Sequence, residues 1–416
     1  MTATGDRTTL TYLRPATAAT DELSAHFQPV FDRVAEGNVE REKNRVFPHE
    51  QVHRLKEAGL GRVRIPVASG GFGASLEQTF ALLADLGEAD ANVAHIWRNH
   101  LAFVEDRLNA TPSPGNDRWI RRFLDGDFVG GGWTEAGNGT FATLQTTVRE
   151  DGGRWRVNGA KFYATGSLYA DWLDVLGKGE GDTVLTALVR RDDPGVELID
   201  DWTGFGQRTT ASGTANYRDV PAEDGDVFPA GERFVYQGHF YQTAMLAVLA
   251  GITRAVVRDG IAALKARGRN YPQALSPEPA TDAQLLQVIG GVSAHAFTAR
   301  AALSASSRTL DLVAAAHAAG DEAARAQRVR EAEVATAQAQ LAIIDAALQA
   351  TTTVFDALGA SGVSQKWLLD RHWRNARTLA SHNPRVYKAR ILGDWLVNGT
   401  DPVPNLAAAG RGGQGD

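Results

Sequence analysis

The chain of 416 residues contains no cysteine and only two methionines. The lack of cysteine excludes disulfides, thiolate nucleophiles, iron–sulfur clusters and zinc–thiolate sites. The formal net charge is −6 and no basic stripe stands out, so a nucleic-acid partner is not expected. We see no apolar run near the ~20 residues that a membrane helix needs. The first residues show no secretory pattern. These absences predict a soluble, cytoplasmic protein that contacts neither nucleic acid nor membrane.

The spacing of hydrophobic residues changes twice along the sequence, which predicts three domains and a tail. Helical spacing dominates up to residue 126, short alternating segments fill 127–235, and helical spacing returns in 236–402. The glycine-rich end, 403–416, is expected to be a flexible tail. The fold class that follows is mainly α with a central β domain.

The helical zones carry clear boundary signals. Residues 75–107 have helical periodicity with a break near Asp90, and Gly59 ends a helical segment that begins at Pro48. Residues 281–319 and 321–358 are long, Ala-rich and amphipathic, which is typical of a helical bundle. Their apolar faces exceed what one small bundle can bury, so we expect a homo-oligomer, a tetramer.

The middle zone has the period of β-strands. Residues 143–149 and 154–159 alternate on either side of Asp151-Gly152-Gly153, which predicts a hairpin. Residues 173–176, 183–189 and 214–220 add further short strands, and Asn158-Gly159 resembles a type I′ turn. Successive strands without intervening helices favour a small antiparallel barrel or sandwich.

Three segments of the middle zone have a composition suited to a ligand. They are Gly131-Gly132-Trp133-Thr134-Glu135, the stretch from Val157 to Gly166, and the stretch from Asp200 to Gly213. Each segment alone fits turns and core packing. In this order and spacing they resemble the β domain of the acyl-CoA dehydrogenase superfamily. The resemblance implies that Trp133-Thr134 and Ala164-Thr165 border a flavin ring, and it places a helical domain before the β domain and a four-helix bundle after it.

The resemblance extends over nearly the whole chain. Residues 66–73 are similar to the family's N-terminal glycine loop, and Gly359-Ala360-Ser361-Gly362 to its late glycine turn. Arg269 matches an arginine that in the family reaches the flavin phosphates of a neighbouring subunit, and the guanidinium fork suits phosphate. The alternative for Arg269 is a solvated helix end.

The segment from Asp370 to Pro384 departs from the dehydrogenases of this family. Many of them carry a catalytic glutamate where this chain has Ser381-His382-Asn383. The pattern Asp370-Arg371-x-Trp373-Arg374-Asn375-x-Arg377-Thr378 resembles instead the flavin-dependent monooxygenase branch, and within it the dibenzothiophene monooxygenases. So does Asp200-Asp201-Trp202 followed by Gly206-x-Arg208-x-Thr210-x-Ser212-Gly213. Asn99 and Thr165 stand where that group has a tyrosine and a serine.

The branch implies a function and a set of site residues. His95, Thr165 and His382 are the expected catalytic residues, with His382 and Thr165 stabilising a flavin C4a-hydroperoxide and His95 acting on substrate. Asn99, Tyr163, Trp202 and Trp97 are expected to bind a small aromatic or heteroatom-containing substrate. His95 and His100 point in different directions on a helix, which is poor metal geometry.

The implied cofactor is reduced FMN, which reacts with O2, and FAD is a further possibility. No nicotinamide-binding motif is present, so an NAD(P)H-dependent flavin reductase is the expected partner. Two alternatives stay open from sequence: an FAD oxidoreductase of the acyl-CoA dehydrogenase type, and a flavin-free scaffold or binding protein.

Overall fold

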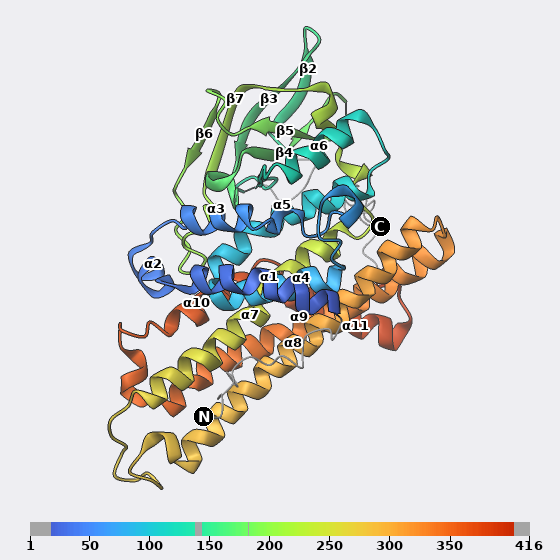
Figure 1. Ribbon diagram of the computed structural model, residues 1–416. Coiled ribbons are helices and arrows are strands. Elements are labelled where there is room, and N and C mark those ends of the chain that lie inside the picture. The colour runs from blue at the N-terminus through green and yellow to red at the C-terminus, as the bar shows by residue number, and fades with distance from the viewer. Residues whose placement is uncertain (1–17, 138–143, 182, 403–416) are drawn as a thin grey trace.

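The computed structural model describes residues 18–137, 144–181 and 183–402. The predicted tail at 403–416 and the first residues of the chain lie outside this part. The described elements run helices, strands, helices, as the changes of spacing predict (Figure 1). Figure 1 shows the sheet at one end of the molecule, the N-terminal helices across its middle, and the long α8 and α9 at the other end.

The N-terminal zone holds six α-helices: α1 (Ala18–Ala35), α2 (Asn38–Asn44), α3 (His49–Glu57), α4 (Leu76–Ala89), α5 (Ala91–Asn109) and α6 (Pro114–Leu124). A capping box at Ser75 and Gln78 begins α4. The predicted break at Asp90 is confirmed, because its carboxylate accepts hydrogen bonds from the N–H groups of Asn92 and Val93, at 3.0 and 3.3 Å, and so begins α5. This cap sets the residue at which α5 begins, and α5 carries several residues of the candidate site.

The central zone is one sheet of eight strands in the order β6-β7-β3-β2-β4-β5-β8, with β1 added beside β4. The strands are β1 (Val129–Gly132), β2 (Thr147–Asp151), β3 (Arg154–Lys161), β4 (Trp172–Lys178), β5 (Val184–Arg190), β6 (Val196–Ile199), β7 (Thr214–Ala222) and β8 (Val227–Pro229).

Two details of the sheet differ from the sequence prediction. The β2–β3 hairpin is confirmed, but β1 pairs with β4 in parallel. The predicted turn at Asn158-Gly159 is wrong. These residues lie inside β3, where a register shift marks a bulge, and a Cβ on Gly159 would lie 2.5 Å from Thr146 Cα. A glycine is needed there because φ is +139° and the neighbouring backbone is close.

The C-terminal zone is the expected helical bundle, with α7 (Gln237–Lys265), α8 (Ala283–Ala318), α9 (Glu322–Thr353), α10 (Asp370–Ala380) and α11 (Arg385–Asn398). The sequence prediction missed that α7 is long and apolar enough to span a membrane. An 18-residue window of α7 has a mean hydropathy of 1.4, and 94% of this window is buried inside the protein. α7 therefore packs as the core helix of the bundle, against α4, α8 and α9.

Candidate functional site

Helix α5 turns three polar side chains toward the junction of the sheet with α7 and α10. His95, Arg98 and Asn99 are three and four residues apart, so they share one face of the helix. Trp97 lies on another face, fully buried against Phe128 at 4.8 Å between ring centroids. Its ring has no exposed surface, and the role of Trp97 in substrate binding stays a prediction.

His95 is a buried imidazole with one free nitrogen. Its Nδ1 lies 3.1 Å from Oε1 of Gln207, and its exposed fraction is 7%. Its Nε2 is buried and has no hydrogen-bond partner in the described part of the chain. Burial lowers the pKa of His95 well below its usual value, and the nearby Arg98 and His382 lower it further. His95 is therefore neutral at pH 7. Since an amide oxygen can only accept, Nδ1 carries the proton and Nε2 presents a lone pair.

Gln207, which the sequence analysis passed over, orients His95 from the loop between β6 and β7. Its side chain is 1% exposed, and its backbone N–H donates to Oδ1 of Asn375 at 2.6 Å. It is a non-glycine residue with a positive φ of 53°. A Cβ on the preceding Gly206 would lie 2.1 Å from the carbonyl oxygen of Arg374, so the loop lies directly on α10. Gly206 is the feature of the sequence that could have indicated this loop. The reason why a glycine is required there becomes visible only from its contact with α10.

The polar residues of α10 hold this loop. Arg374 donates to Oε1 of Glu42 at 2.8 Å and to the carbonyl of Phe205 at 3.0 Å, while Arg371 pairs with Asp259. Trp373 is 39% exposed and stacks on Phe205 at 5.7 Å. The Arg- and Asn-rich segment therefore supports the site more than it lines it.

Thr165 stands at the head of a chain of hydroxyl groups. Its Oγ1 lies 2.8 Å from Oγ of Ser212, which lies 2.8 Å from Oγ1 of Thr210. Thr210 donates to the carbonyl of Gln207, so Ser212 must donate to Thr210 and Thr165 to Ser212. The proton of Thr165 is thereby committed, and its lone pairs remain. In this arrangement the hydroxyl of Thr165 would act on a ligand as a hydrogen-bond acceptor.

The other residues predicted near the flavin ring lie around Thr165. Ala164 is fully buried, and its N–H donates to the carbonyl of Gly213. Trp133 donates from Nε1 to Asp174 at 3.0 Å, and Thr134 is exposed. Asn99 donates from Nδ2 to the carbonyl of Thr165 at 3.0 Å, so in this structure Asn99 supports Thr165.

His382 comes to the same place from the turn after α10. Its Nε2 lies 3.2 Å from Nη1 of Arg98, and since a guanidinium can only donate, Nδ1 of His382 carries the proton. Desolvation of the ring and the charge of Arg98 lower the pKa of His382, against the effect of the Asn383 side chain. Because the residue as a whole is exposed, water weakens the effect of desolvation but leaves its direction unchanged. His382 is thus a neutral imidazole beside a cation.

Two aromatic residues predicted to bind substrate lie together at the edge of this region. Tyr163 and Trp202 meet edge to face, with ring centroids 5.8 Å apart. Tyr163 is 51% exposed, and its φ of +60° is unusual for a tyrosine. Trp202 donates from Nε1 to the carbonyl of Gly206. Both rings therefore adjoin the loop that carries Gln207.

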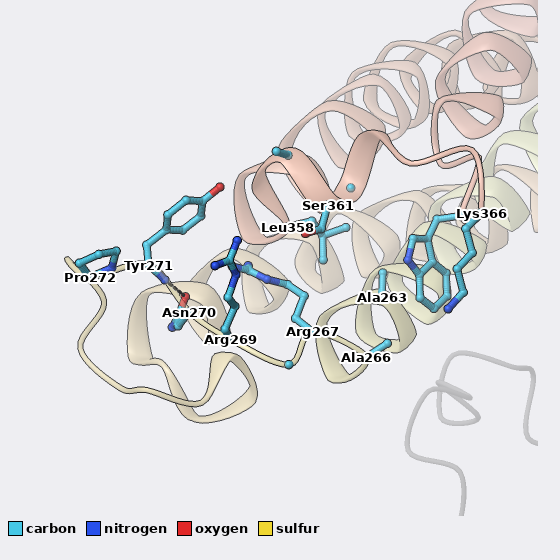
Figure 2. Close-up of a pocket in the computed structure, with 14 residues that line it drawn as sticks. Ala263, Ala266, Arg267, Arg269, Asn270, Tyr271, Pro272, Leu358, Ser361 and Lys366 are labelled. Carbon is cyan, nitrogen blue, oxygen red and sulfur yellow. Dashed lines mark hydrogen bonds between the residues drawn. The ribbon is translucent and has the colours of Figure 1, made fainter.

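A second group of predicted residues lies apart from this cluster. Arg269 and Gly362 border a cavity of about 500 Å³ between the end of α7 and the turn after α9 (Figure 2), and Gly359 lies in the same turn between the lining residues Leu358 and Ala360. Arg267 and Lys366 add two further cations, and none of the lining residues is acidic. The cavity therefore suits an anion such as a phosphate. Gly359 has a φ of +56°, and a Cβ there would lie 2.8 Å from the hydroxyl of Tyr271.

Comparison with known families agrees with this fold domain by domain. The N-terminal, middle and C-terminal domains of acyl-CoA dehydrogenase match residues 19–127, 130–220 and 243–385. The chain belongs to the acyl-CoA dehydrogenase family. The fold class predicted from sequence is thereby confirmed.

Individual relatives within the family cover almost the full chain. The chain is 27% identical over 406 residues to the probable FMNH2-dependent monooxygenase SfnC of Pseudomonas putida, covering 94% of this chain and 97% of SfnC. It is 26% identical over 387 residues to dibenzothiophene monooxygenase of Mycolicibacterium goodii, covering 89% and 92%. The complex of TdsC from Paenibacillus sp. A11-2 with FMN and indole has the same fold, with a TM-score of 0.82, 21% identity, and 94% and 99% coverage.

Proposed function

We propose that the protein is the oxygenase of a two-component, FMN-dependent monooxygenase system that acts on a small aromatic or heteroatom-containing substrate. The observation that carries the proposal is the neutral imidazole of His382, which stands where the family's dehydrogenases carry a catalytic glutamate, near the second neutral imidazole of His95. The dehydrogenases use that glutamate to remove the α proton of their substrate, and this chain has no glutamate at that position. The relatives named as monooxygenases support the same reading.

The residues present fit a reduced flavin. Nε2 of His95 and Nε2 of Gln207 are both buried without partners in the described chain, and such groups favour a polar ligand. Thr165 presents lone pairs that suit an N–H of the reduced ring. When bound, reduced FMN supplies two electrons to O2, so that one oxygen atom enters the substrate, the other leaves as water, and oxidised FMN remains.

The protein's own groups would then divide the remaining tasks. His95 accepts a proton at Nε2, His382 donates from Nδ1, and the amide of Gln207 donates to an oxygen in a region closed to water. Trp202 and Tyr163 offer aromatic surface to the substrate. Trp133 and Ala164 would border the flavin, as the family resemblance implies.

The cationic cavity at Arg269 supports an oligomeric assembly. It lies at a different place from His95, yet its charge suits a flavin phosphate. We propose that Arg269 and the turn at Gly359–Gly362 serve the flavin of a neighbouring subunit in a tetramer. The single phosphate of FMN is sufficient for this role. Reduced FMN would come from an NAD(P)H-dependent flavin reductase.

The test is a reaction of the purified protein with chemically reduced FMN, O2 and a trial substrate such as indole or dibenzothiophene. We expect an oxygenated product in proportion to flavin oxidised. The acyl-CoA dehydrogenase alternative predicts instead that an acyl-CoA bleaches bound FAD without oxygen. The scaffold alternative predicts that added flavin keeps its full fluorescence. Either of these results would overturn the proposal.

A further inference from the structure

Tyr241 on α7 lies against the candidate site, although the sequence analysis did not single it out. The guanidinium of Arg98 lies over its ring, 5.0 Å from the centroid, and the ring of Trp133 lies 6.2 Å away between centroids. One turn further along α7, the sulfur of Met245 lies 3.3 Å from Nη1 of Arg98. The same Nη1 lies 3.2 Å from Nε2 of His382. Tyr241 therefore contacts both the end of β1 and the pair of Arg98 and His382.

The hydroxyl of Tyr241 has no hydrogen-bond partner in the described part of the chain. The residue is partly exposed, and its hydroxyl oxygen keeps accessible surface. The hydroxyl of Tyr236, at the start of the same helix, instead donates to the carboxylate of Glu105. The hydroxyl of Tyr217 is buried without a partner among the described residues. Tyr241 thus presents an unused polar group at the surface of the site.

The surroundings of Tyr241 favour a neutral phenol that donates its proton. Burial of the ring and the charge of Asp174 raise the pKa of Tyr241, against the opposite effects of Arg233 and Arg98. The hydroxyl is therefore protonated at pH 7. The nearest cation, Arg98, can only donate, and Nε2 of His382 is already directed at it. Because no acceptor of the described chain reaches the Tyr241 hydroxyl, its proton is available to a ligand.

We propose that the hydroxyl of Tyr241 is a specificity-determining donor, which binds a hydrogen-bond acceptor of the substrate such as a carbonyl oxygen or an aromatic nitrogen. The inference rests on the proposed function, because it takes the space beside Arg98 and His382 as the place where the substrate binds. It narrows the substrate class to small molecules that carry such an acceptor. A site that offers a hydrogen bond disfavours an analogue without the acceptor, since the polar group of the protein then stays unpaired.

Bound flavin is a second source of acceptors, because its ring carries carbonyl oxygens and nitrogens. The experiment therefore has two arms, both with the full-length protein. The first uses calorimetry, with and without oxidised FMN, to measure the binding of two pairs of molecules of nearly the same shape. The pairs are acetophenone with α-methylstyrene, and quinoline with naphthalene; only the first member of each pair has an acceptor. The second arm measures the affinity for oxidised FMN alone.

The variants are Tyr241→Phe and, as a matched control, Tyr217→Phe. Both lose one hydroxyl, but that of Tyr217 is buried and has no surface to offer a ligand. The measured quantity is the ratio of the two affinities within a pair, so the difference in hydration between the two molecules cancels when proteins are compared. For at least one pair, the ratio should be roughly 3–10-fold lower in Tyr241→Phe than in the wild type, as the loss of one hydrogen bond predicts. Tyr217→Phe should keep the wild-type ratio.

Ratios that stay unchanged in Tyr241→Phe for both pairs would overturn the proposal, and a simultaneous loss of affinity for FMN would assign the hydroxyl to the flavin instead. A wild type that binds neither acetophenone nor quinoline at millimolar concentration would overturn it as well. Tyr241→Phe keeps the ring against Arg98 and Trp133, and an unchanged melting temperature excludes misfolding. Formation of product from reduced FMN and O2 is scored separately, so a failure here differs from a failure of the proposed function.

Discussion

Replacement of Gln207 tests whether one amide decides the chemistry of His95. Oε1 of Gln207 is the hydrogen-bond partner of Nδ1, at 3.1 Å in a buried setting. In Gln207→Leu, the Nδ1–H form would leave a buried donor unsatisfied, which costs about 1–3 kcal/mol. Because Nε2 is also buried without a partner in the described chain, the variant has no reason to prefer either form. The ratio of the Nδ1–H form to the Nε2–H form should therefore fall by roughly 5–150-fold, which leaves the Nε2 lone pair in only part of the population. Turnover that needs this lone pair should fall with that population.

The tautomer can be measured without any flavin. In protein labelled with ¹⁵N-histidine, nitrogen shifts distinguish a protonated from an unprotonated ring nitrogen, and His95→Ala identifies the signal. We expect His95 to be protonated at Nδ1 in the wild type and to be a mixture of the Nδ1–H and Nε2–H forms in Gln207→Leu. A wild-type ring protonated at Nε2 would refute the reasoning, whatever the activity.

The carboxylate variant adds a pH readout. The groups that face His95 are Gln207 from the loop, Arg98 on its own helix and His382 from the turn after α10. Gln207→Glu adds an opposite charge next to Nδ1, which typically raises the pKa of a histidine by about 1–3 units. Because a protonated ring has no lone pair, the acid limb of the activity profile should move to higher pH. In a His95→Ala background, neither substitution at Gln207 should change the profile.

Further predictions concern coupling, assembly and stability. His382→Ala should bind FMN yet release hydrogen peroxide without product, with a loss of coupled turnover of ~10²–10³. An oxygen electrode and a peroxide assay would show this. A variant that stays fully coupled would mean that His382 is only a packing residue. Thr165→Ala should also uncouple, whereas Thr165→Ser should be mild because the hydroxyl remains. Light scattering should give a tetramer, and Arg269→Ala should weaken FMN roughly tenfold or more; a monomer would contradict this assembly. His100 and His372 have pKa values lowered to about 4, chiefly by burial. Unfolded histidine titrates near 6.5, so below that pH the unfolded state binds more protons than the folded state. The free energy of unfolding should therefore fall by up to about 1.4 kcal/mol per pH unit for each of the two histidines. Denaturant midpoints between pH 7 and pH 5 would measure this fall.

The elements that sequence predicted well are those whose signals are local. Asp90 caps α5 because its carboxylate accepts from the N–H groups two and three residues further on, so residue type and position suffice. The β2–β3 hairpin likewise follows from Gly152 and Gly153, both with positive φ. Asn158-Gly159 misled because its signal is also local, whereas its place inside β3 is set by pairing with β7 and by Thr146.

The site was harder to predict, because its decisive contacts join distant parts of the chain. His95 and Gln207 are 112 residues apart, and Arg98 and His382 are 284 apart. Resemblance to the family indicated the histidines, but no pattern in the chain states which ring nitrogen carries a proton. The burial of Trp97 was not foreseen, because residue type cannot tell which face of α5 is buried.

The loop from Gln207 to Ser212 joins the two halves of the site. The side chain of Gln207 fixes the proton of His95, while its carbonyl receives the hydroxyl chain that runs from Thr165 through Ser212 and Thr210. A shift of this loop would therefore change a base and an acceptor together. Asn375 holds the loop by the N–H of Gln207, so α10 acts on His95 and Thr165 without touching either. This explains why the Arg- and Asn-rich residues of α10 support the site residues without being reacting groups themselves.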